Sequence, residues 1–101
     1  MRRLPRFYVY LLLSDRGEVY AGFTGDIRRR LKEHNAADNT GWTRGRRWHL
    51  LAVRCFLDRH SAAIAERQLK RSRFDKSNWV RRQRRRLREL CRRHGIEHAL
   101  D

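Results

Sequence analysis

The chain has 101 residues, which suffice for one compact domain with a modest core, and no Pro-, Gly- or Ser-rich linker divides it, so we expect a single domain over residues 1–101. Lys and Arg number 26 against 11 Asp and Glu, which gives a formal net charge of +15 at pH 7 and a sequence pI near 11.6. This balance favours nucleic acid as the partner. It argues against an anionic membrane surface, because the arginines are interleaved with apolar residues at helical spacing instead of forming a tail.

The apolar run at residues 7–13 follows Arg2 and Arg3 and superficially resembles a signal peptide. It holds only seven residues, Asp15 and Arg16 follow at once, and no small-residue cleavage site is present. Its aromatic and branched residues predict a strand. We therefore expect neither export nor a membrane span, and a cytoplasmic location.

Residues 14–17 are Ser, Asp, Arg and Gly, which are typical of a turn, and residues 18–24 resume an extended pattern. Together with residues 7–13 they predict a hairpin. Asp26 is placed to cap a helix over residues 27–35.

A polar, basic loop over residues 36–47 precedes a third strand over residues 48–57. Ser61 and Ser77 are placed to cap two further helices, over residues 61–70 and 77–94. The predicted fold class is therefore α/β (α+β), a small three-stranded antiparallel sheet flanked by helices in the order β-β-α-β-α-α.

The helix over residues 27–35 carries polar residues on its apolar stripe. A period of 3.6 places Ile27, Arg30, Leu31 and His34 on one face, turned toward the core. Taken singly, Arg30 can extend its guanidinium to solvent and His34 can be a satisfied histidine at the core edge. Taken together, they indicate a polar site beside the sheet.

The helix over residues 61–70 shows the same anomaly, because Glu66 shares a face with Ala62, Ala65 and Leu69. A carboxylate on an inward face needs a cation. The sequence leaves two partners open, an arginine of this chain or a divalent metal ion.

Tyrosines stand on both strands of the hairpin. Alternation places Tyr8 and Tyr10 on one face of the first strand, and Tyr20, Gly22 and Thr24 on one face of the second. Whether these faces coincide depends on the register. An odd-numbered loop sets Tyr10 across from Tyr20, whereas a four-residue loop puts them on opposite faces, and the sequence leaves both open.

Cys55 and Cys91 are far apart, lack CxxC spacing and fall in apolar patterns, so we expect two buried free thiols. The five histidines show no zinc-ligand spacing with these cysteines, and we expect no structural zinc site.

The last predicted helix is amphipathic and basic, with eight arginines and one glutamate over residues 79–93. Its apolar stripe is expected to pack on the domain and to leave an arginine surface that tracks a phosphate backbone. Trp42, in the basic loop, either stacks on an unpaired base or closes over the core. The residues expected to bind nucleic acid are Arg44, Arg46, Arg47, Arg81, Arg82 and Arg85.

The order of Tyr8-Val9-Tyr10, Tyr20-Ala21-Gly22, Arg30, His34 and Glu66 resembles the GIY-YIG nuclease superfamily, in particular its small single-domain bacterial branch. The resemblance covers roughly residues 7–78. Within it, Tyr8 stands in place of the family's first glycine and Ala21 in place of a branched residue.

This resemblance implies a metal-dependent endonuclease that hydrolyses phosphodiester bonds, with DNA favoured over RNA and a role in DNA repair or recombination. Mg²⁺ or Mn²⁺ would be held by Glu66, and Arg30 would bind the phosphate. Asn78 and Lys70 are possible additional site residues.

The resemblance also assigns roles to the two tyrosines and the histidine. Tyr10 would be the general base, with a nearby cation lowering its pKa and a neutral His34 taking its proton. Tyr20 would orient the phosphate or the attacking water.

Two alternatives remain open. The chain can be a non-catalytic, basic nucleic-acid-binding module of the same fold, because the same residues would be present in either case. Alternatively, the basic face can dock on a ribonucleoprotein or a partner protein.

Overall fold

The chain folds into three strands and four helices in a computed structural model that describes residues 6–99; Arg2 and Arg3 lie outside the described residues. In chain order the elements are β1 (Phe7–Ser14), β2 (Val19–Thr24), α1 (Ile27–Asn35), β3 (Trp48–Phe56), α2 (Arg59–Arg71), α3 (Arg73–Arg82) and α4 (Arg84–His94). The strands form one antiparallel sheet in the spatial order β2-β1-β3. This architecture confirms the predicted fold class, with one helix more than expected.

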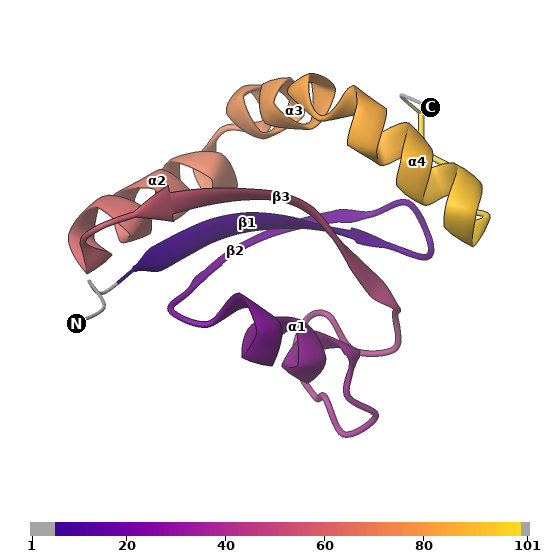
Figure 1. Ribbon diagram of the computed structural model, residues 1–101, viewed down its shortest axis with the longest axis horizontal. Coiled ribbons are helices and arrows are strands. Elements are labelled where there is room, and N and C mark those ends of the chain that lie inside the picture. The colour runs from indigo at the N-terminus through magenta and orange to yellow at the C-terminus, as the bar shows by residue number, and fades with distance from the viewer. Residues whose placement is uncertain (1–5, 100–101) are drawn as a thin grey trace, which may run out of the picture.

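The central strand, β1, is buried on both faces, which explains its apolar sequence. Val9, Leu11 and Leu13 point to one face, where they pack against residues of α2, α3 and α4. Tyr10 and Leu12 point to the other face, toward α1. Figure 1 shows the two layers, with α1 on one side of the sheet and the other three helices on the opposite side.

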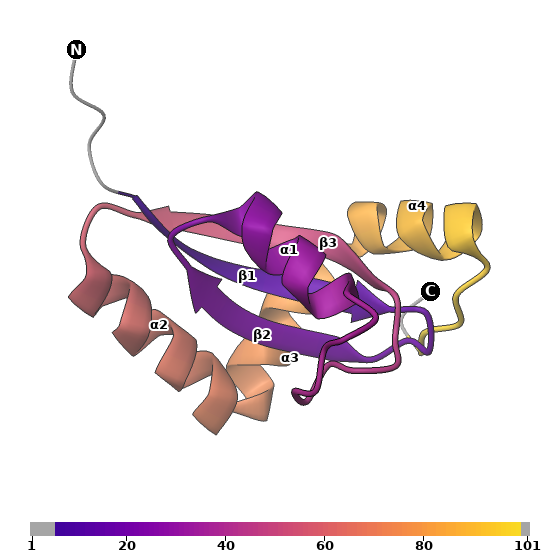
Figure 2. The same ribbon diagram turned by 90° about the horizontal axis from the view of Figure 1, so that it is seen from below.

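The two edges of the sheet have different neighbours. Seen from the α1 side, α2 runs beside β2 at one edge, and α4 lies along β3 at the other (Figure 2). The arginine-rich α4 and the β2 edge therefore lie on opposite sides of the molecule.

The caps of the first two helices differ in how well the sequence predicts them. Asp26 caps α1 as expected, because its side chain accepts the backbone N–H of Arg29. The prediction that Ser61 caps the next helix is wrong, because Asp58 is the cap. Ser61 is the third residue of α2, where both its N–H and its hydroxyl donate to the Asp58 carboxylate.

The single predicted C-terminal helix is in fact two helices. Ser72, not Ser77, caps α3, because the Ser72 hydroxyl accepts the N–H of Asp75. No Gly or Pro lies between the two serines, so the helix that begins after Ser72 continues through Ser77. The backbone then breaks at Gln83 without either of the usual helix breakers. This break lets α3 and α4 each lay apolar residues on the same face of the curved sheet (Figure 1). The predicted end at residue 94 is confirmed, and Gly95 follows at a φ of 66°.

Cys55 and Cys91 are not joined by a disulfide, and they differ in exposure. Cys91 is buried in the core as predicted, whereas the prediction of burial is wrong for Cys55. Cys55 pairs with Tyr8 near the end of β3, an edge strand, and the short α1 does not cover that end. Within residues 6–99, no helix has the length and apolar character needed to cross a membrane.

Candidate active site

The register of the hairpin puts Tyr10 and Tyr20 on the same face of the sheet. Tyr10 pairs with Gly22 and Leu12 pairs with Tyr20, so the two tyrosines are diagonal neighbours on the α1 face. Of the two alternatives that the sequence left open, opposite faces are excluded, and direct pairing is replaced by an offset of two residues along β2. The side chains of Tyr10 and Tyr20 therefore lie on the same face of the sheet, a question that the sequence left open.

Gly22 provides the space that the ring of Tyr10 occupies. A Cβ atom built on Gly22 would collide with the hydroxyl and the adjacent ring carbon of Tyr10. Residue 22 must therefore be glycine for Tyr10 to occupy its observed position.

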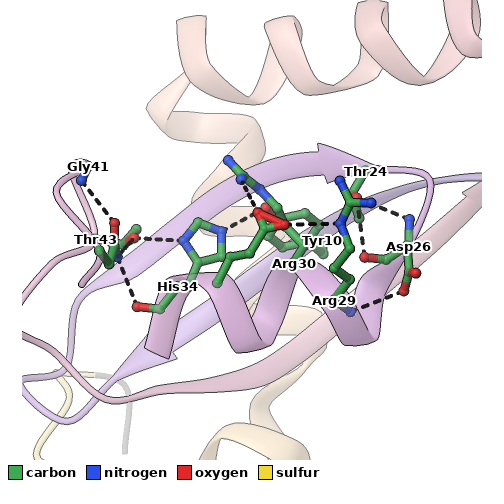
Figure 3. Close-up of polar contacts among 10 residues, drawn as sticks. Tyr10, Thr24, Asp26, Arg29, Arg30, His34, Gly41 and Thr43 are labelled. Carbon is green, nitrogen blue, oxygen red and sulfur yellow. Dashed lines mark hydrogen bonds and ion pairs between the residues drawn. The ribbon is translucent and has the colours of Figure 1, made fainter. Parts of the chain in front are cut away.

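Helix α1 places His34 inward and Arg30 at the rim. His34 is 5% exposed, and its Nε2 lies 3.0 Å from the Tyr10 hydroxyl oxygen (Figure 3). The Tyr20 ring meets the same imidazole edge-on, with 5.2 Å between ring centroids. The Arg30 side chain is 43% exposed and pairs with Glu33, with Nη1 and Oε2 3.2 Å apart. The stripe predicted from the helical period therefore brings both polar residues to the two tyrosines.

The loop after α1 completes the hydrogen bonding of His34. Nδ1 lies 2.6 Å from the Thr43 hydroxyl, and Thr43 is buried (Figure 3). The Asn39 amide donates to the Thr43 hydroxyl and to the His34 carbonyl oxygen, at 2.9 Å each. Sequence reasoning missed both loop residues, because a loop has no periodicity. The signal that could have found them is that a buried imidazole needs a partner at each ring nitrogen.

The protonation states of Tyr10 and His34 follow from their burial. Burial raises the pKa of Tyr10 to about 12, and the positive charge of Arg30 only partly offsets this effect. Burial and Arg30 hold the pKa of His34 below its usual 6.5. At neutral pH we therefore assign the Tyr10 hydroxyl as donor to Nε2, and the Nδ1–H of His34 as donor to Thr43. The expectation that a cation leaves Tyr10 with a lowered pKa is wrong, because burial outweighs Arg30.

Glu66 reaches the site from α2. Its side chain is 22% exposed and its charge contributes to the raised pKa of Tyr10. Its ion-pair partner is Lys70, with Nζ and Oε2 3.8 Å apart, and no arginine pairs with it in the part of the chain that the structure describes. The same Lys70 ammonium lies 5.6 Å from the centroid of the Tyr20 ring.

A divalent cation implied by the sequence resemblance has one candidate carboxylate ligand here. Among residues 6–99, no three side chains of Asp, Glu, His or Cys gather in an arrangement that could hold a metal ion. Mg²⁺ commonly binds through one or two carboxylates together with substrate phosphates and water. The single carboxylate of Glu66 is compatible with a site of that kind.

An open pocket of about 370 Å³ lies beside these residues. Tyr20, Arg30 and His34 line one side of it, and the loop from Asp38 to Thr43 lines the other. Tyr10 is 2% exposed and lies beneath this lining. The pocket therefore presents an exposed guanidinium and a phenol, with the Tyr10–His34 pair behind them.

The remaining predicted residues lie away from this cluster or have other partners. Asn78 is half-buried in the middle of α3, and it makes no hydrogen bond to the cluster within residues 6–99. The Arg46 guanidinium binds Glu18 in the hairpin turn, with Nε and Oε1 2.6 Å apart. Arg44 and Arg47 are exposed on the loop, and the exposed helical arginines include Arg81, Arg82 and Arg85.

Comparisons with known proteins identify relatives of this chain. A family model described as the GIY-YIG catalytic domain matches residues 6–78. The UPF0213 protein of Haloquadratum walsbyi is 38% identical over 64 residues, 62% of this chain and 72% of that protein. The UPF0213 protein of Xanthomonas axonopodis pv. citri is 37% identical over 91 residues, 88% of this chain and 89% of that one.

A solved structure is also similar. It is the solution NMR structure of a UPF0213 protein from Bacillus halodurans, at 35% identity and a TM-score of 0.49. The match covers 74% of this chain and 82% of that chain.

Proposed function

Because the chain belongs to the GIY-YIG family of catalytic domains, we propose that it is a metal-dependent endonuclease that hydrolyses phosphodiester bonds. The observation that carries this proposal is the contact of the Tyr10 hydroxyl with His34 Nε2, 3.0 Å away, beside the exposed guanidinium of Arg30. A proton acceptor and a phosphate-binding cation thereby share one pocket. Hydrolysis of a phosphodiester requires both a group that accepts the proton of water and a group that stabilises the charge on the phosphate.

Arg30 is proposed to bind the scissile phosphate. Its guanidinium is a planar fork of donors that matches two non-bridging phosphate oxygens, and it lines the open pocket. Glu33, its present partner, is exposed and would release it to a phosphate group, which carries a full charge and several acceptors. Tyr20 lines the same pocket and would orient the attacking water.

Tyr10 and His34 are proposed to move the proton. The water oxygen loses a proton to Tyr10 Oη while Tyr10 passes its own proton to His34 Nε2. The water oxygen forms a bond to phosphorus, the bond from phosphorus to the leaving sugar oxygen breaks, and that oxygen takes a proton from solvent. A concerted transfer avoids a free phenolate, which a pKa of about 12 makes scarce at neutral pH.

Thr43 keeps the imidazole oriented during this transfer, because it accepts the Nδ1–H whether or not Nε2 is protonated. A divalent cation on Glu66 would, when bound, neutralise charge on the phosphate and the leaving oxygen. Nucleic acid is the proposed polymer and DNA the proposed substrate. The exposed arginines of α3 and α4, Arg81, Arg82 and Arg85 among them, would contact phosphates without selecting sequence.

The test is cleavage of labelled single-stranded, duplex, flapped and branched DNA, and of RNA, with and without Mg²⁺ or Mn²⁺. Arg30→Ala is expected to lower kcat by roughly 10²- to 10³-fold, as for other donors aimed at developing charge. Arg29→Ala is the matched control, because Arg29 also pairs with Glu33 but is 78% exposed and does not line the pocket. Glu66→Gln is expected to abolish metal-dependent cleavage while binding persists.

A non-catalytic binding module of the same fold is the competing function. It predicts that the wild type binds the panel and cuts nothing with either metal. Cleavage by the wild type that Arg30→Ala and Glu66→Gln remove, and that Arg29→Ala retains, would reject that alternative.

A further inference from the structure

Trp42 is the most exposed large apolar side chain in the described part of the molecule. It is 91% exposed, whereas Trp48 and Trp79 are each 5% exposed and belong to the two cores. The possibility that Trp42 closes over the core is therefore wrong. A ring this exposed contributes little to folding and is available to contact a ligand.

The loop holds Trp42 in place from both sides. The N–H of Gly41 donates to the Asn39 side-chain oxygen at 2.9 Å, and Asn39 itself is bonded to the backbone of His34. On the other side, the indole of Trp48 donates to the Thr43 carbonyl oxygen at 2.8 Å. Both neighbours of Trp42 are thus fixed to the frame of the site. The exposed ring is presented on an ordered support, so binding loses little conformational entropy.

Trp42 stands between two hollows. One is the pocket that contains Arg30 and His34, and the other has a volume of about 650 Å³ and is lined by Arg16, Arg44 and Arg46. An aromatic plane flanked by cations on both sides matches a strand of nucleic acid, in which flat bases alternate with anionic phosphates. Apart from Trp42, the residues that line the second hollow are three arginines, Asn39 and Gly45, which favours an anionic ligand over an apolar peptide segment.

We propose that Trp42 stacks on an unpaired base next to the phosphate held by Arg30, with the following phosphate on the arginines of the second hollow. This inference rests on the proposed function for the position of the scissile phosphate. A base inside a duplex has both faces covered by its neighbours, so only an unpaired or displaced base offers a face to the indole. The substrate class is therefore nucleic acid with a single-stranded segment at the site of cleavage.

The test measures binding without chemistry. Affinity of the full chain in EDTA is measured for a single-stranded DNA oligonucleotide and for a long blunt DNA duplex, whose ends are few relative to its binding sites. Trp42→Ala is expected to weaken single-strand binding by about 5- to 150-fold, which is stacking of ~1–3 kcal/mol converted at 1.4 kcal/mol per tenfold. Duplex affinity is expected to change less than about twofold, and the salt dependence of binding is expected to stay the same, because the indole carries no charge.

Two controls isolate the stacking. Trp42→Phe keeps an aromatic plane and is expected to retain most of the affinity. Leu57→Ala removes another exposed apolar side chain, 65% exposed, just beyond the opposite end of β3, and is expected to leave both affinities unchanged.

Removing a base from the oligonucleotide is the second change in a double-mutant cycle with Trp42→Ala. Scanning a single abasic position along the oligonucleotide should reveal one position where the wild type loses affinity and Trp42→Ala loses nothing further. Additive losses at every position, or equal losses of Trp42→Ala on single strand and duplex, would overturn the stacking proposal.

The outcomes separate the two proposals. If the wild type cleaves and depends on Arg30 and Glu66, but Trp42→Ala binds single strands as the wild type does, the nuclease stands and the stacking site fails. If the abasic cycle shows coupling but the wild type cuts nothing with Mg²⁺ or Mn²⁺, the stacking site stands and the nuclease fails.

Discussion

Gly22 lies directly across from Tyr10 in the hairpin, and the Tyr10 ring occupies the space that any side chain at residue 22 would need. Gly22→Ala is therefore expected to displace the Tyr10 hydroxyl from His34 and to destabilise the fold by about 1–3 kcal/mol, as overpacking of a core does. Urea denaturation measures the stability, and a cleavage assay measures the loss of activity.

Gly25→Ala is the matched control for that substitution. A Cβ at Gly25 meets only the Arg6 carbonyl oxygen at 3.9 Å, which is an ordinary contact. The control is expected to fold and cleave like the wild type. Equal effects of the two substitutions would contradict the steric role of Gly22.

Thr43→Val keeps the shape of the side chain and removes the acceptor for His34 Nδ1. Because the imidazole is buried, the lost bond is expected to lower the free energy of unfolding by about 1–3 kcal/mol. The rate of cleavage at saturating substrate is expected to fall more than the affinity, because the proton acceptor loses its orientation. Thr40→Val, on an exposed threonine of the same loop, is expected to leave the free energy of unfolding unchanged.

His34 makes stability and rate depend on pH. Its folded pKa lies below the usual value of 6.5, so in the window between the two values the unfolded chain binds a proton that the folded chain does not. The free energy of unfolding then rises with pH through this window: the contribution is fully present above about pH 6.5 and is lost as the pH falls through the folded pKa. The cleavage rate is expected to fall over the same acid range, because only a neutral imidazole accepts the Tyr10 proton.

Chemical denaturation and single-turnover cleavage between pH 5 and pH 8 measure these two effects. Burial also lowers the pKa of His49, which stacks on His94 at 3.8 Å between ring centroids, so His49 titrates in the same direction. His49→Gln is therefore expected to reduce the pH dependence of stability but to keep the acid limb of the rate. An acid limb that persists in the residual activity of His34→Gln would argue against the proton transfer.

The thiols offer a direct check on the fold. Cys55 is exposed and Cys91 is buried, so a maleimide is expected to modify one thiol in the native protein and two in guanidinium chloride, as counted by mass spectrometry. Two fast-reacting thiols in the native state would mean that α4 is not packed as described.

The arginines of α4 are expected to set the salt dependence of duplex binding. Arg85 and Arg88 line a groove on α4 and make no ion pair among residues 6–99. Replacing both with Gln is expected to reduce the slope of log affinity against log salt by ~0.9 for each lost phosphate contact. Arg86→Gln with Arg93→Gln is the matched comparison, because both of these arginines already pair with Glu89. An equal change in slope for the two double variants would contradict the expectation that arginines without an ion pair contact phosphate more than paired ones do.

The sequence predicted the parts of the fold that local rules determine. The hairpin, α1 with its Asp26 cap and the end of the last helix follow from turn residues, capping and periodicity, and they appear at the predicted positions to within one or two residues. The inward stripe of α1 also located the candidate site, because His34 and Arg30 interrupt an otherwise apolar pattern.

The features that the sequence did not predict depend on contacts between distant segments. Thr43 becomes a partner of His34 only when the loop folds back, and the break at Gln83 follows from packing on the sheet instead of from a Gly or Pro. The raised pKa of Tyr10 is a third case, since the balance of burial against Arg30 exists only in the folded protein.

The hydrogen bonds that link His34, Thr43 and Asn39 set a rule for redesign. A loop transplanted whole from another protein would bring a new recognition surface and at the same time remove the support of the imidazole. Libraries aimed at altered selectivity are therefore best built with Asn39 and Thr43 fixed and with the outward positions, Trp42 and Arg44 among them, randomised.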